Sequence, residues 1–252
     1  NNGIFEGWGT SLCWWANRLG FSEKLTKKSA RLFFSEEGLS LNIMRYNIGG
    51  GDDPHHNHIT RTDSEMPGWW KYDEAIKKFR FNSDTDKNQL NVLKAAYEAA
   101  GENAYVEAFS NSPPYFMTRT GCSSGSKNGK GDNIKLSSIH LFANYLTDVC
   151  KYIQNNLGIT IKSLAPMNEP FSDYWKLNSG KQEGCPVSPG FMQSNVIKAT
   201  AAELKKKKLN NIILTASDDT NTKRQFISAL LMSRSAMREI GRLSTHTYAK
   251  AT

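Results

Sequence analysis

The sequence predicts an α/β fold of the (β/α)8 TIM-barrel class, with about six of the eight strand and helix units present. Three observations lead to this prediction. Apolar strand-like segments alternate with amphipathic helical segments, an order typical of parallel sheets with helical crossovers. Polar and aromatic side chains follow nearly every predicted strand, where a barrel carries its active site. The length of 252 residues is close to the ~250 of a typical barrel domain.

Six segments are expected to form the strands, because each is an apolar run of the kind that forms strands. They are Ile4 to Leu12, Leu39 to Ile48, Ala104 to Phe109, Thr160 to Met167, Asn211 to Ala216 and Arg242 to Tyr248. Two further units would need roughly 70 more residues at this spacing, but the sixth segment ends four residues before Thr252. We therefore expect residues 1–252 to be a C-terminally truncated catalytic barrel, with the remaining strands absent.

Four helices are predicted between the strands, from apolar residues that recur at intervals of three and four. The clearest covers about 138–154, with a serine to cap it and a glycine after it. A second covers about 85–100 and a third opens at Ser22. The fourth covers roughly 191–207, and the lysine run Lys205 to Lys208 at its end complements the helix dipole.

Composition narrows the possible partners. Lys and Arg outnumber Asp and Glu by 32 to 24, a net charge of +8 that favours anionic polymers. The densest basic run lies at a predicted helix end, however, and the sequence contains no recognisable nucleic-acid motif. No apolar run approaches the ~18 residues of a membrane span. We therefore expect neither a nucleic-acid partner nor a membrane partner.

The sequence also gives little support to a cofactor or a metal. It lacks the glycine-rich signatures of dinucleotide and phosphate binding, so we expect no cofactor. His55, His56 and His58 suggest a metal site, but they lie in an Asp/Pro/Asn loop without the spacing that sets coordination geometry, and we expect none. Cys122 and Cys185 lie in two loops, and a bridge between them remains open.

The most informative segment is Ser163 to Pro170, in which an apolar strand delivers Asn168 and Glu169 to the exit of the sheet. A carboxyl half walled by apolar side chains has a raised pKa and can protonate a leaving oxygen, while the amide holds a substrate hydroxyl. A simple turn is the alternative. Arg45 lies inside another apolar strand, so its charge must meet an acidic partner, either as a buried ion pair or as support for a catalytic carboxylate.

Two further strand ends carry candidate residues. After the third strand, two prolines lead into an aromatic segment that includes Asn111 and Tyr115, which suits either a sugar-binding wall or a packed loop. The sixth strand ends in His246 and Tyr248. The tyrosine hydroxyl either donates to a carboxylate or is satisfied at the rim of the barrel.

Taken together, these segments resemble glycoside hydrolase family 30, a retaining group in the large clan of (β/α)8 glycosidases. The resemblance covers essentially the whole chain. Within the family, the sequence is most similar to the endo-β-1,6-galactanase branch, which acts on galactan side chains of arabinogalactan. It rests on Phe5 to Leu12 with Trp14-Trp15, Arg45 to Gly51, Asn111 to Thr118, Asn168 to Pro170, Gln182 to Cys185 and Ala216 to Asp219.

The resemblance implies hydrolysis by double displacement. Glu169 matches the family's acid/base, Asn168 the residue that binds the substrate 2-hydroxyl, and Arg45 and Tyr248 those that position the nucleophile. The nucleophile is a glutamate at the end of the seventh strand and would lie beyond Thr252, so the resemblance implies that residues 1–252 alone are inactive. The expected substrate contacts are Trp8, Asp52, His55, Asn111, Tyr115, Tyr174, Trp175, Asp218 and His246.

The family also carries a β-sandwich beside the barrel, which is not visible in this sequence. The resemblance implies a secreted, extracellular protein that binds a polysaccharide or oligosaccharide, and we expect a monomer. Relatives in the family also attack β-1,6-glucan, glucuronoxylan and glucosylceramide, so these substrates remain alternatives. A carbohydrate-binding remnant without catalysis is another, motivated by the missing nucleophile, and a nucleic-acid binder is supported by net charge alone.

Overall fold

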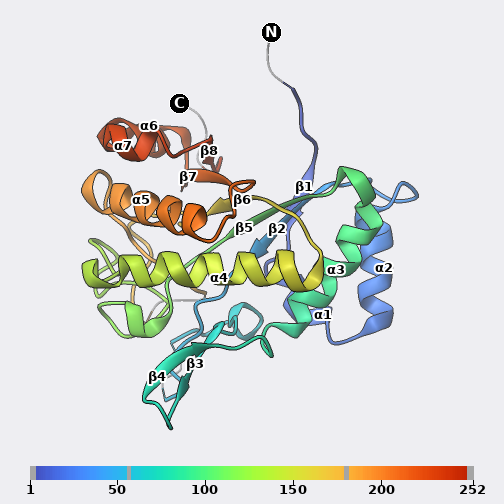
Figure 1. Ribbon diagram of the computed structural model, residues 1–252, viewed down its shortest axis with the longest axis horizontal. Helices are drawn as coiled ribbons and strands as arrows, with labels where there is room; N and C mark the ends of the chain where they lie inside the picture. The colour runs from blue at the N-terminus through green and yellow to red at the C-terminus, as the bar shows by residue number, and fades with distance from the viewer. Residues whose placement is uncertain (1–3, 56–57, 179–181, 249–252) are drawn as a thin grey trace.

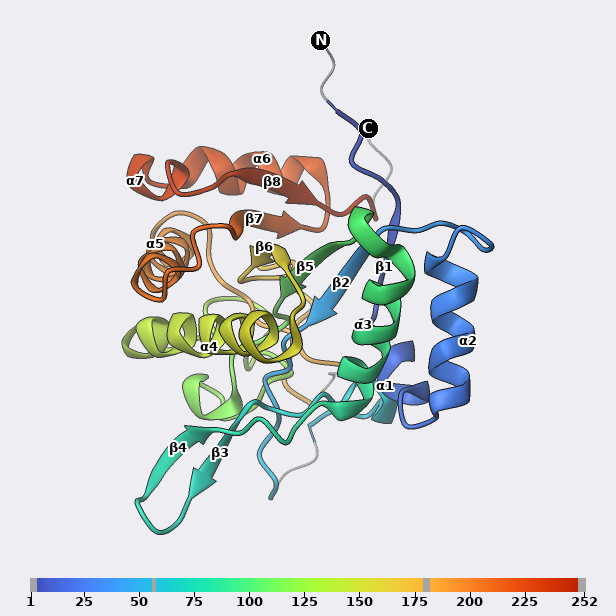
Figure 2. The same cartoon turned by 45° about the vertical axis from the view of Figure 1, so that its right-hand side comes forward.

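The computed structural model describes residues 4–55, 58–178 and 182–248. Its main sheet has six parallel strands whose spatial order follows the chain, so the sheet forms half of a barrel. Figure 1 and Figure 2 show the helices packed around the outside of this sheet. The strands are β1 (Gly9–Ser11), β2 (Ile43–Asn47), β5 (Tyr105–Phe109), β6 (Ile161–Ala165), β7 (Ile213–Asp219) and β8 (Arg242–Thr245). The predicted α/β class is confirmed.

Each predicted strand segment overlaps one of these strands, but most of the strands are shorter than predicted. The first begins at Gly9 rather than Ile4, because the residues before it lie in solvent, where Ile4 is 92% exposed. The fifth instead extends to Asp219, beyond its apolar part. Neighbouring polar side chains therefore belong to the strand itself rather than to the loop after it.

All four predicted helices are present: α2 (Glu23–Phe34), α3 (Lys87–Ala100), α4 (Ile139–Leu157) and α5 (Phe191–Lys206). Ser22 caps α2 by accepting a hydrogen bond from the amide of Leu25. Asp86 precedes α3 without capping it, because its carboxylate turns inward and accepts hydrogen bonds from Tyr46 and Gln89 instead.

Several short elements were not predicted, because they are too brief for a periodic pattern to identify. They are α1 (Trp15–Leu19), α6 (Thr222–Leu231), α7 (Arg234–Met237) and the antiparallel hairpin of β3 (Trp70–Asp73) and β4 (Lys78–Phe81). The hairpin projects from one end of the half-barrel (Figure 2). Its base packs on α4, where the rings of Trp69 and Phe81 contact Tyr152.

Alternation along the strands separates the core from the site. Met44, Val106 and Leu164 face the helices and are fully buried. Their neighbours point to the opposite face. On that face Arg45 and Glu107 lie side by side in register, and Ser163 is the register partner of Glu107. Charged groups are thus brought together inside the half-barrel.

The four cysteines are free thiols. Cys122 and Cys185 are buried in adjacent loop segments, which are joined by a 2.8 Å hydrogen bond from the Gly184 amide to the Ser123 carbonyl. The bridge left open by the sequence is not formed in this structure. No helix among the described ranges is long and apolar enough to cross a membrane.

Candidate active site

Charged and polar side chains meet where the strands of the half-barrel end. Glu107 lies in β5 and Asp218 in β7. Asn168 and Glu169 follow β6, and His246 follows β8. With Arg45 from β2, these side chains form a single network, which we call the Arg45 network.

Arg45 is the centre of this network. Its Nε donates to Glu107 Oε1 at 2.9 Å. Its terminal nitrogens Nη2 and Nη1 lie 3.3 and 3.4 Å from Asn168 Oδ1, and Nη2 also donates to Asp218 Oδ2. Burial alone would lower the pKa of the guanidinium, but the charges of Asp218 and Glu107 outweigh it and raise that pKa. The acidic partner predicted for Arg45 is therefore a pair of carboxylates.

Asp218 links three strands of the sheet. Burial opposes ionisation of its carboxyl, but Arg45 and His246 outweigh burial and hold the pKa of Asp218 below its usual range. Its carbonyl accepts a 2.8 Å hydrogen bond from the Glu169 amide. Asp218 and Glu169 both adopt left-handed backbone conformations, with φ of 64° and 48°. Backbone strain of this kind, at residues other than glycine, is concentrated at functional sites.

Glu169 is only 4% exposed, and both of its carboxyl oxygens have neighbours. Tyr174 donates its hydroxyl hydrogen to Oε2, and His246 Nδ1 lies 3.6 Å from Oε1. Burial and the Glu169 carboxylate together raise the pKa of Tyr174. The Tyr248 phenol also faces Glu169, and burial followed by this carboxylate raises the pKa of Tyr248. Glu169 therefore lies among two phenols and an imidazole.

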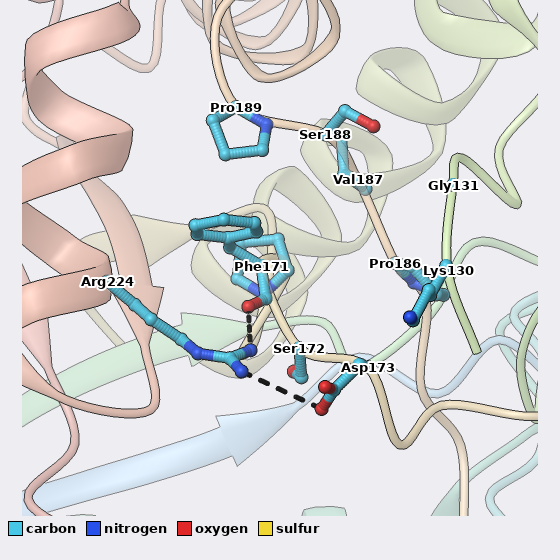
Figure 3. A pocket seen from close by; sticks show the side chains of 11 residues that line it. Lys130, Gly131, Phe171, Ser172, Asp173, Pro186, Val187, Ser188, Pro189 and Arg224 are labelled. Atoms are coloured by element: carbon cyan, nitrogen blue, oxygen red, sulfur yellow. Dashed lines mark hydrogen bonds and ion pairs between the residues drawn. The ribbon is translucent and has the colours of Figure 1, made fainter.

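The segment after Glu169 is held on both sides. The Phe171 amide donates to Asp219 Oδ1 at 2.9 Å, and Arg224 donates to the Phe171 carbonyl. Arg224 also lies 3.7 Å from the carboxylate of Asp173. Figure 3 shows the two contacts of Arg224, with Phe171 and with Asp173, at a pocket that is also lined by the segment 186–189. The pocket has a volume of about 280 Å³. The backbone that carries Glu169 is thus fixed by charged side chains of β7 and α6.

Trp8 and Trp175 occupy positions outside the side chains of the Arg45 network. Trp8 precedes β1, at the end of the sheet where the strands begin, and its ring contacts Phe5 in solvent. Trp175 is buried behind Glu169, where its Nε1 donates to the Glu169 carbonyl at 3.1 Å. Its ring packs so closely on Gly184 that a Cβ there would overlap it. Trp175 therefore supports the Glu169 backbone from behind.

The other predicted contacts lie in the loops at the carboxyl ends of the strands. Asp52 and Tyr115 line a second cavity, of about 590 Å³, between the β2 loop and the β3–β4 hairpin. His55 is exposed in the same loop. Asn111 is buried and donates to Asn47 Oδ1 at 3.2 Å. The structure thus spreads these residues along one edge of the half-barrel, and only Tyr174, Asp218 and His246 join the catalytic candidates.

The sequence patterns did not identify two glutamates, Glu107 and Glu183. Glu107 is partly buried and lies in register with Arg45, and the available signal was a charged residue that interrupts an otherwise apolar strand. Glu183 is fully buried, and its Oε1 accepts hydrogen bonds from the amides of Gly50 and Gly51 at 2.7 and 3.2 Å. Burial outweighs these donors and raises the pKa of Glu183 to about 8.

Within the described ranges 4–55, 58–178 and 182–248, no group of three or more His, Cys, Asp or Glu side chains is placed to hold a metal ion. His56, one of the three histidines considered from the sequence, lies outside these ranges.

A carboxyl at the carboxyl edge of a half-barrel, beside an amide and a buried guanidinium, is suited to proton transfer at a bound sugar. Fold and site together define the class of (β/α)8 glycoside hydrolases. Residues 2–226 match O-glycosyl hydrolase family 30. The chain belongs to this family.

Two curated relatives bear β-1,6-galactan-related names. The chain is 33% identical to an endo-β-1,6-galactanase of Hypocrea rufa over 98% of its length, which corresponds to 53% of that protein. It is 29% identical to an exo-β-1,6-galactobiohydrolase of Bifidobacterium longum subsp. longum over 68% of its length and 14% of the relative. The chain thus spans about half of the first relative and much less of the second.

Solved structures agree on the fold. A conserved exported protein of Bacteroides fragilis superposes with a TM-score of 0.78 at 19% identity, covering 89% of this chain and 45% of that protein. The catalytic domain of the family 30 xylanase C of Talaromyces cellulolyticus gives a TM-score of 0.71 at 19% identity, covering 98% and 54%. In each case the chain corresponds to about half of the solved structure.

Proposed function

We propose that the whole protein is a retaining glycoside hydrolase that cleaves β-1,6-linked galactan by double displacement. The observation that carries this proposal is the position of Glu169, almost fully buried at the end of β6 between Tyr174 and His246. Both curated relatives are named for β-1,6-linked galactose, and this supports the proposed linkage.

Three members of the Arg45 network, together with Tyr248, have roles in this proposal. Glu169 protonates the departing glycosidic oxygen and then deprotonates the water of the second step. Asn168 holds the substrate 2-hydroxyl. Arg45 and Tyr248 orient the nucleophile, a glutamate that we place beyond Thr252. Because retaining chemistry requires two carboxyls ~5 to 5.5 Å apart, residues 1–252 without that partner should not turn over substrate.

The proposed substrate path extends from Glu169 along the loops of β2 and β5. Tyr174 is 47% exposed beside Glu169 and can contact the sugar whose bond is cleaved. The cavity bordered by Asp52 and Tyr115 offers aromatic and carboxylate groups to a longer chain. A polymeric substrate is met outside cells, so we propose that the protein is secreted and acts as a monomer.

The test uses the whole protein against a panel of β-1,6-galactan, β-1,6-glucan, glucuronoxylan and glucosylceramide. We expect cleavage of β-1,6-galactan with retention at the anomeric carbon. Proton NMR of the first product measures its anomeric configuration. Glu169→Gln should lower kcat/KM by about 10²-fold or more. Full activity of Glu169→Gln, or an inverted first product, would refute the proposed mechanism. Cleavage of another polymer alone would refute the proposed substrate.

Residues 1–252 alone provide a second comparison. We expect this chain to bind β-1,6-galacto-oligosaccharides in a calorimetric titration without hydrolysing them. Turnover by this chain that survives Glu169→Gln would contradict the placement of both catalytic carboxyls.

A further inference from the structure

His246 lies between two carboxyl groups of the site. Its Nδ1 is 3.6 Å from Glu169 Oε1, and its Nε2 is 3.4 Å from Asp218 Oδ1. The imidazole is mostly buried, and its ring packs 4.8 Å from the ring of Tyr248. The two carboxyls differ in their surroundings, because Asp218 is bound to Arg45 while Glu169 is bound to Tyr174.

We propose that Asp218 is a positioning residue that acts on Glu169 through His246. Asp218 holds the imidazole hydrogen on Nε2, so that Nδ1 presents its lone pair to Glu169 and accepts the hydrogen of the protonated acid. The inference rests on the proposed function, because it concerns how the acid/base is kept ready for the first step.

Asp218 is held in its ionised form by its neighbours. Its side chain is 7% exposed and bonded to the guanidinium of Arg45. Arg45 is fixed in turn by Glu107, whose carboxylate also accepts a 3.2 Å hydrogen bond from the Ser163 hydroxyl. A carboxylate paired in this way with a permanent cation stays ionised. Asp218 therefore offers His246 an acceptor and no hydrogen of its own.

The surroundings of the imidazole decide which of its nitrogens carries the hydrogen. Its Nε2 is inaccessible to water and makes no hydrogen bond within the described part of the chain. A buried polar group of this kind needs a partner, and Asp218 Oδ1 is the group that faces it. In a neutral imidazole one nitrogen donates and the other accepts. A hydrogen on Nε2 therefore leaves Nδ1 as the acceptor.

Glu169 has a neighbour for each of its two protonation states. A hydrogen bond to the protonated form of a carboxyl favours that form, and His246 Nδ1 can accept one from Oε1. Tyr174 donates to Oε2, which favours the ionised form. Both states met during the reaction thus have a partner. In the first step the hydrogen passes from Glu169 to the departing oxygen. In the second step a water hydrogen returns to Glu169, and His246 and Asp218 end unchanged.

The two other protonation states of His246 fit less well. A hydrogen on Nδ1 alone would turn the Nε2 lone pair toward the ionised Asp218. An imidazolium would donate to both carboxyls and hold Glu169 ionised, which disfavours an acid catalyst. Histidine tautomers in catalytic sites are set by such a carboxylate partner.

A direct test observes the ring nitrogens of the whole protein labelled with ¹⁵N at histidine. His246→Gln identifies the resonance by its absence. We expect a neutral imidazole with hydrogen on Nε2, and loss of this state in Asp218→Asn. Asp219→Asn is the matched control, because Asp219 is the adjacent buried carboxyl and its side chain contacts the Phe171 amide instead. Hydrogen on Nδ1, or on both nitrogens, in the unaltered protein would overturn the proposal.

A kinetic test uses aryl β-1,6-galactobiosides with good and poor leaving groups. Asp218→Asn should lower kcat/KM by about tenfold or more for a phenyl group, which needs protonation, and by less than about twofold for a dinitrophenyl group. Should Asp218→Asn fail to fold, His246→Gln gives the same comparison. Equal losses for both leaving groups would overturn the role of Asp218. If the unaltered protein hydrolyses neither glycoside, the proposed function fails, and the ¹⁵N measurement alone decides this inference.

Discussion

Glu183 allows a prediction that joins stability to pH. Its carboxyl is fully buried against the amides of Gly50 and Gly51, with a pKa raised from 4.5 to about 8. The folded state therefore binds a proton more tightly than the unfolded state. The resulting stability is fully present below about pH 4.5 and is lost as pH rises through about 8. At ~1.4 kcal/mol per pKa unit, the loss is on the order of 5 kcal/mol.

Glu183→Gln removes this loss, because the amide stays neutral and keeps an oxygen for Gly50 and Gly51. We expect the unfolding free energy of the variant to exceed that of the unaltered protein at about pH 9, and the two to agree within ~1 kcal/mol at about pH 5. Urea titrations at both pH values measure the difference. Glu102→Gln, at an exposed position, is the control and should change neither value. A variant less stable than the unaltered protein at the higher pH would refute the reasoning, because the ionised Glu183 carboxylate would then stabilise the fold instead of destabilising it.

The remaining predictions concern Arg45 and Gly184. Arg45→Met leaves Glu107 and Asp218 buried without their cation, so we expect a loss of roughly 3–5 kcal/mol in unfolding free energy. A loss below about 1 kcal/mol in chemical denaturation would contradict the buried ion pair. Gly184→Ala drives a methyl group into the Trp175 ring, which should cost ~1–3 kcal/mol and lower kcat by moving the Glu169 backbone. Unchanged kcat and unchanged intrinsic Trp fluorescence would show that the ring does not support Glu169.

Sequence patterns predicted the regular elements well and the irregular ones poorly. The repeating apolar residues of α4 lie on its buried side, so periodicity located it closely. The β3–β4 hairpin has strands of four residues, and its position depends on packing against α4. Such contacts between distant segments leave no local pattern. The hairpin was therefore visible only in the folded chain.

The two tryptophans show the same limit for the site. Trp8 belongs to a segment that carries the family resemblance, and Trp175 closely follows Glu169 in the sequence. The rings of both residues suit sugar binding. Trp8 lies before β1 and Trp175 beneath Glu169, so neither faces the Arg45 network. Residue type indicates what a side chain can bind. Its direction depends on the backbone path around it.

By itself, the sequence determined the alternation of strands and helices, the placement of Glu169 at a strand exit and the need of Arg45 for an acidic partner. Each follows from local periodicity or from the cost of burying an isolated charge. Only the tertiary structure decided that this partner is Glu107 together with Asp218, and that His246 joins Asp218 to Glu169. Those pairings depend on the register of parallel strands from distant parts of the chain, which no local pattern encodes.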